Sequence, residues 1–246
     1  MGPYDLLWDG GGSDNSWATA ENWEGDVLPA NGQTLAIING DTVDIPANNY
    51  SLGTNVTVNV AGGSQIDNTA AAARFHTGMI FNFFSGSGIG GQWLQVENTA
   101  LNFEDGATFT ASTVQHRFTS TYGMTLSSTG FTTLTPGSLK SWDESTDWSD
   151  VVFNIDVSKY DANNGLVVEL MDFSSHDPIY SDNFTPTVNL TAGDSGLSGT
   201  LSFDSASSKV IYTFDSVPTT YQITFVNVDD SVTIQSVAAG VVATPP

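Results

Sequence analysis

Short apolar runs alternate with polar turn residues along nearly the whole chain. The runs are rich in Val, Ile, Thr and Phe, and Gly, Asn, Asp and Ser stand between them. This arrangement is typical of strands joined by turns. Helical periodicity is almost absent, and the exception is NTAAAARF at 68–75, which favours at most two helical turns. We therefore predict an all-β protein.

The first half of the chain has a regular spacing. Apolar runs begin at residues 35, 55, 78, 99 and 123, in steps of 20, 23, 21 and 24 residues. Such steps are typical of the coils of a parallel β-solenoid, in which each coil adds strands to those of the previous coil. We predict a β-solenoid-like region over residues 1–139. An antiparallel sandwich with long loops is the alternative.

The candidate strands of the second half are more closely spaced. From residue 199 onward, candidate strands recur every ten to thirteen residues, and FDSASSKVIY has the pattern of a hairpin. We predict an antiparallel β-sandwich-like region over 151–239. An acidic connection at 140–150 precedes it, and a small-residue tail at 240–246 has the composition of a linker. The seven candidate strands lie at 150–157, 165–173, 185–191, 199–205, 208–216, 220–228 and 232–238.

Charge excludes several classes of partner. The chain has 27 acidic and five basic residues, a net charge of −22. Such a field repels phosphate backbones, so we expect no nucleic-acid partner. We also expect no membrane span, because no apolar run is long enough for one. There is no cysteine, which excludes thiol chemistry. Acid-rich loops at 9–15, 143–150 and 227–231 offer oxygen ligands, so a structural calcium is the one cofactor we consider.

Three tryptophans stand near the N-terminus, in WDGGGSDNSWATAENWEGDVLPANGQTLAIING at 8–40. This segment resembles the entry segment of exported bacterial autotransporter passengers and PEP-CTERM-type β-solenoid proteins. The resemblance implies export to the cell surface or medium and a solenoid after the segment, but no activity. It departs from the pattern at 33–34, where Gln-Thr replaces the usual acidic residue. Its features are Trp8, Gly10, Trp17, Asn22, Trp23, Gly25, Pro29, Gly32 and the apolar run 35–38.

The tryptophans support two different roles. The first coil of a solenoid has an exposed end that invites aggregation. Packed indoles at Trp8, Trp17 and Trp23 would cover that end and bury apolar area. The alternative is a sugar-stacking platform, for which these three residues and Trp93 are the candidate ligand-binding residues.

Candidate catalytic residues are few. GSGIGG at 86–91 lacks the strand and helix of a dinucleotide site and indicates a turn; GDSG at 193–196 also indicates a turn. His76 and His116 lie 40 residues apart, and each has an arginine within two residues, Arg74 and Arg117. On one solenoid face they could bind an anionic sugar or act in a polysaccharide lyase. The alternative is a surface pair without chemistry, and no third metal ligand accompanies the histidines.

We predict an exported, non-catalytic surface or matrix protein that binds polysaccharide or a cell-surface glycan. A polysaccharide lyase or hydrolase with an Arg/His site is the first alternative. A structural subunit that self-assembles through its sheet edges is the second.

Overall fold

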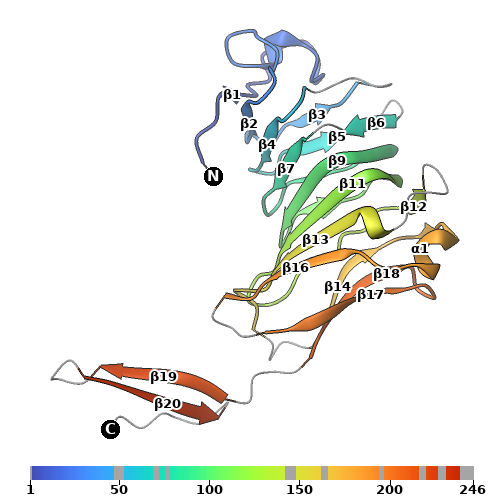
Figure 1. Ribbon diagram of the computed structural model, residues 1–246. Helices are drawn as coiled ribbons and strands as arrows, with labels where there is room; N and C mark the ends of the chain where they lie inside the picture. The colour runs from blue at the N-terminus through green and yellow to red at the C-terminus, as the bar shows by residue number, and fades with distance from the viewer. Residues whose placement is uncertain are drawn as a thin grey trace.

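The computed structural model describes residues 2–46, 53–68, 72–75, 78–141, 148–161, 166–193, 197–215, 220–226 and 231–238. The protein is nearly all-β, as predicted, and its N-terminal half is a parallel β-solenoid. Among the described residues, three ladders of parallel strands run along the solenoid, and its middle coils contribute a strand to all three (Figure 1). The described residues also form three short helices: η1 (Ala20–Asn22), η2 (Trp148–Asp150) and α1 (Pro178–Asp182).

Two strands belong to two ladders each. The second parts of β9 and β11 lie in the first ladder, and their first parts lie in the third. The first ladder contains β1 (Leu6–Leu7), β2 (Thr34–Ile37), β4 (Thr57–Val60), β7 (Ile80–Phe83), β9 (Trp93–Glu104), β11 (Thr113–Thr125), β13 (Val151–Asp156) and β16 (Thr187–Thr191). The second contains β3 (Thr42–Asp44), β5 (Gln65–Asp67), β8 (Gly88–Ile89) and β10 (Thr108–Phe109). The third adds β6 (Ala72–Phe75), β12 (Ser138–Ser141) and β15 (Ser175–His176).

Strand register explains the spacing seen in the sequence. Leu35, Val58, Phe81, Leu101 and Tyr122 are successive partners in the first ladder, so these coils are 23, 23, 20 and 21 residues long. All five side chains are buried. The regular coil therefore comes from one inward apolar position repeated in each turn of the solenoid, as the sequence indicated.

The parallel ladder continues past residue 139. Tyr122 pairs with Phe153, and Phe153 pairs with Val188, so these two coils are 31 and 35 residues long. Strands β13 and β16 are therefore parallel members of the solenoid, although we expected both in the antiparallel region. Strand β13 keeps the inward alternation of buried residues, but the longer connections before and after it remove the regular spacing that marks a solenoid.

Residues 72–75, in the segment for which we predicted helical turns, form strand β6 instead. Ala73 and Phe75 are buried and pair in register with Leu94 and Val96 of β9. Alanine favours a helix only weakly when tertiary contacts oppose it. The backbone hydrogen bonds of the ladder and the buried Phe75 ring, stacked 4.5 Å from Phe81, provide those contacts here.

Antiparallel strands follow in the second half, as predicted. Strands β14 (Val167–Asp172), β18 (Lys209–Phe214) and β17 (Gly199–Asp204) form one sheet, and the predicted hairpin is the β17–β18 pair. Leu170 and Tyr212 from this sheet belong to the same buried cluster as Phe153 of the solenoid. The antiparallel sheet and the solenoid therefore share one hydrophobic core.

Strand β16 is the last strand of the first ladder. All five of its residues are exposed, including the inward-row residues Val188 and Leu190. Beyond the three-stranded sheet, β19 (Thr220–Val226) and β20 (Val232–Ala238) form an antiparallel hairpin whose strands pair only with each other in the described chain. The edge of β16 is one that self-assembly through sheet edges could use, and that alternative stays a prediction.

Candidate functional site

Trp8, Trp17 and Trp23 pack together at the N-terminal end of the solenoid, and all three are buried. Trp23 is the central ring: it meets Trp8 edge-to-face at 5.2 Å and Trp17 at 4.9 Å between centroids. Its Nε1 donates to the Trp17 carbonyl at 2.9 Å. The three rings thus fill the position of a cap, and their burial leaves them no surface on which a sugar could stack.

Asn22 explains why a polar residue precedes the central tryptophan. It is fully buried, and its Nδ2 donates to the Ser16 carbonyl at 3.0 Å while its Oδ1 accepts from the Gly12 amide at 2.9 Å. A Cβ at Gly12 would lie 2.5 Å from that Oδ1, so the position suits glycine. The glycine-rich loop therefore satisfies the buried amide that holds the cap together.

The outward face of the third ladder gathers the remaining candidate chemistry. Leu94, Val96 and Val114 point into the core, so the residues that alternate with them point outward. Four of these outward residues form a register column across β6, β9, β11 and β12, with a cation at each end: Arg74, Gln95, Gln115 and Lys140. Trp93, Thr113 and Ser138 form the neighbouring column.

Trp93 stands at a hollow on this face. The hollow has a volume of about 620 Å³ and is lined by Gln92, Trp93, Ser112, Thr113, Gln115 and Lys140. Trp93 leaves 38% of its surface exposed, whereas Gln115 beside it is buried. The lining combines one aromatic ring with amides, hydroxyls and an amine. The sequence had named Trp93 alone of these residues.

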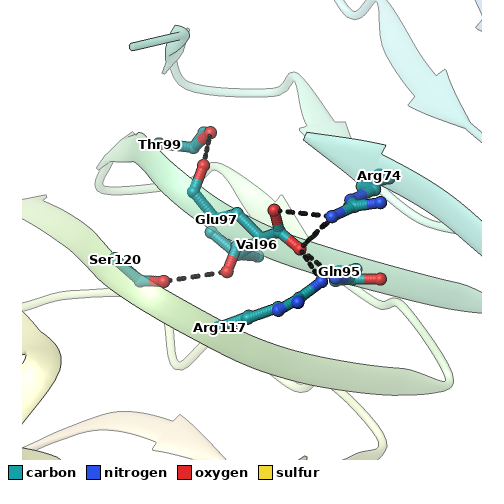
Figure 2. A network of polar contacts seen from close by, with 7 residues as sticks. All are labelled: Arg74, Gln95, Val96, Glu97, Thr99, Arg117 and Ser120. Carbon is teal, nitrogen blue, oxygen red and sulfur yellow. Dashed lines mark hydrogen bonds and ion pairs between the residues drawn. The ribbon is translucent and has the colours of Figure 1, made fainter. Parts of the chain in front are cut away.

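The two candidate arginines bind one buried carboxylate at the edge of the third ladder, the ladder that carries the hollow (Figure 2). Glu97 is 4% exposed, and Arg74 donates to its two oxygens from Nε at 3.1 Å and from a terminal nitrogen at 3.0 Å. Arg117 donates to the same carboxylate at 3.3 Å, and the Gln95 amide donates to it as well. Two guanidinium groups share one carboxylate, so the cluster has one excess positive charge.

The strands bend where this cluster lies. Asn98 and Phe118 have positive φ angles of 44° and 58°, and the β9–β11 register shifts between Arg117 and Ser120. Ser120 Oγ donates to the Val96 carbonyl at 3.0 Å and Thr99 Oγ1 donates to the Glu97 carbonyl at 2.8 Å across the bend. The Glu97 cluster therefore lies where each strand passes from the third ladder into the first.

His116 lies on the opposite side of its strand from the arginines. It is buried against Trp148 and Tyr180, and its Nε2 lies 2.6 Å from the Tyr122 hydroxyl. Burial lowers the pKa of His116 to about 3. A side chain in this position contacts the core and does not reach the hollow. His76 lies outside the described residues.

We expect replacement of His116 by glutamine to weaken the pH dependence of stability. Below pH 6.5 the unfolded histidine gains a proton that the folded one, with its pKa near 3, does not. Wild-type stability therefore falls relative to His116→Gln as the pH decreases, by about 2 kcal/mol between pH 7 and pH 5. Urea unfolding of both proteins at the two pH values measures this difference. Parallel changes in the two proteins would contradict it.

The acidic loops have structural hydrogen bonds. Asp9 Oδ1 accepts from the Gly11 amide at 3.0 Å, and Asp14 Oδ1 accepts from the Ser16 amide at 3.0 Å. Within the described residues, no group of three or more His, Asp or Glu could hold a metal ion. Much of the loops at 143–150 and 227–231 lies outside those residues, so the calcium expectation stays a prediction.

Comparison with known proteins identified no relative of this chain. No protein-family model matches the chain, and no curated protein and no solved structure matches it.

None of the helices among the described residues is long and apolar enough to cross a membrane. The fold defines the class of this protein as a Trp-capped parallel β-solenoid with an antiparallel sheet at the C-terminal end of the solenoid. Its candidate site is the outward face of the third ladder, where polar groups surround one aromatic ring.

Proposed function

We propose that this chain is an exported, non-catalytic module that binds polysaccharide across the outward face of the third ladder. The observation that carries the proposal is the exposed Trp93 ring in a hollow whose other lining groups are polar. The opening segment, with its resemblance to exported solenoid proteins, supports the proposed location at the cell surface or outside the cell.

The lining chemistry suits a sugar. A pyranose has one face of C–H groups, which packs on an indole, and a rim of hydroxyls that both donate and accept hydrogen bonds. Trp93 offers the ring, and the exposed Gln92 amide and Ser112 hydroxyl offer both kinds of hydrogen-bonding group. A small-ligand site usually consists of an apolar contact surface with a few polar groups around it.

The arrangement gives little support to the lyase or hydrolase alternative. A catalytic base must lie within hydrogen-bond reach of the proton that it removes. His116 is buried, and its Nε2 is engaged by Tyr122. Arg74 and Arg117 are held by Glu97. The module therefore offers a surface for binding, and neither His116 nor the two arginines is placed as a base beside the hollow.

Replacing Trp93 with alanine is expected to weaken polysaccharide binding by about five- to thirtyfold. Loss of one stacked ring removes about 1–2 kcal/mol of contact energy, and 1.4 kcal/mol corresponds to a factor of ten. Affinity electrophoresis against a panel of neutral and acidic polysaccharides measures the effect. Tyr4→Ala is the matched control, because Tyr4 is another exposed aromatic residue, in the segment before β1. Unchanged retention of the Trp93 variant would refute the proposed site.

A further inference from the structure

We propose that the polysaccharide bound at this face is anionic and that Lys140 binds an acidic group of the sugar. This inference rests on the proposed function and names the class of its ligand. Its first support is the distribution of charge. The chain has only five basic residues against 27 acidic ones, yet Arg74, Arg117 and Lys140 all lie on the third ladder.

The three cations differ in what they can offer a ligand. Arg74 and Arg117 share the Glu97 carboxylate, which leaves one excess positive charge at that cluster. Lys140 is exposed, lines the hollow and forms no ion pair among the residues that the structure describes. Lys140 is therefore the group placed to contact an anion, and the arginine cluster adds a positive field beside it.

Strand register sets the length of the ligand. Lys140 is paired with Gln115, which is paired with Gln95, and Trp93 lies on the same strand as Gln95. Trp93 and Lys140 are thus two strands apart, and with neighbouring strands about 4.8 Å apart the separation along the ladder is about 10 Å. One pyranose ring does not span this separation. A ligand that contacts both residues has at least two sugar units, with the acidic group on the unit beyond the stacked one.

The surrounding acidity makes this face selective. The third ladder carries three of the five basic residues, so a polyanion meets attractive charge there, whereas the excess of carboxylates over the chain as a whole repels it. An exposed charge pair contributes modestly, and we expect an acidic polymer to bind about fivefold more tightly than its neutral form. High salt should remove this preference, because screening acts over about 3 Å at 1 M ionic strength.

The test compares matched polymers on the intact chain. Polygalacturonate and its methyl-esterified form differ in charge on the same backbone, and dextran sulfate and dextran test sulfate in place of carboxylate. The variants are Lys140→Met, which keeps the apolar stem, and Lys159→Met, which makes the same charge change at a different hollow. Trp93→Ala reports on the proposed function. Affinities are measured at low salt and at 1 M salt.

We expect wild type and Lys159→Met to prefer an acidic polymer, and Lys140→Met to bind both forms of that polymer alike. The member of the panel that shows this preference identifies the acidic group as carboxylate or sulfate. Tight binding of neutral forms only, or an unchanged preference in Lys140→Met, would overturn this inference. If Trp93→Ala still lost binding in those cases, the proposed function would stand. Retention of no polymer would overturn both proposals.

Discussion

Replacing Trp23 with alanine is expected to lower the free energy of unfolding by about 3–5 kcal/mol, the range found for large buried aromatic residues. Trp23 is fully buried and makes edge-to-face contacts with both Trp8 and Trp17, so truncation removes both contacts and leaves a cavity beside the two remaining rings. The change also removes the hydrogen bond from the indole to the Trp17 carbonyl.

The effect of Trp23→Ala should extend to solubility. The first strand pairs, β1 with β2 and β2 with β4, lie beneath the cap, and an uncovered strand edge can pair with another chain. Chemical unfolding measures the stability loss, and light scattering during the same experiment measures aggregation. Trp93→Ala is the matched control, since Trp93 is partly exposed and its loss should cost less than about 1 kcal/mol. Equal losses in the two variants would contradict the capping role.

Much of the fold could be predicted because one physical repeat produces it. An inward apolar residue must recur once per coil, and Leu35, Val58 and Phe81 show this as a step of 23 residues. The cap could be predicted for a similar reason, because three tryptophans before the first regular coil have an exposed end to cover. A pattern that burial produces can be recognised in the sequence without knowing which residues contact one another.

The later coils could not be predicted from spacing. The coil from Tyr122 to Phe153 has 31 residues, since the chain makes a long excursion between β11 and β13. The period is lost there although Val151, Phe153 and Ile155 keep the inward alternation. Alternation alone does not distinguish parallel from antiparallel strands, because side chains alternate in both.

The candidate site depends on register, which explains why the sequence revealed only part of it. The positions of Gln95, Gln115 and Lys140 become one column only when β9, β11 and β12 are aligned. The two arginines were visible as residues beside histidines, yet their common partner is Glu97, a single acid among 27. Strand alternation could have separated Arg117 from His116, because adjacent residues of a strand face opposite sides.

Replacing Glu97 with glutamine is expected to lower the free energy of unfolding by about 2–3 kcal/mol. Removing one partner of a buried ion pair costs about 3–5 kcal/mol, because it leaves an uncompensated charge. We expect less here, since Arg74 and Arg117 are 29% and 27% exposed and water solvates part of their charge. Glutamine keeps the shape of the side chain, so the effect reports on charge rather than on packing.

Glu169→Gln provides the matched control for the Glu97 variant. Glu169 also pairs with a cation, Lys209 at 2.8 Å, but its side chain is 44% exposed, so its loss should cost less than about 1 kcal/mol. Adding Arg117→Met to Glu97→Gln removes one of the two facing cations and should recover part of the stability, which chemical unfolding of the single and double variants measures. If Glu97→Gln cost no more than the Glu169 control, the carboxylate would not be what holds the two arginines at the bend. A double variant less stable than Glu97→Gln alone would show that Arg117 stabilises the bend through packing, independently of Glu97.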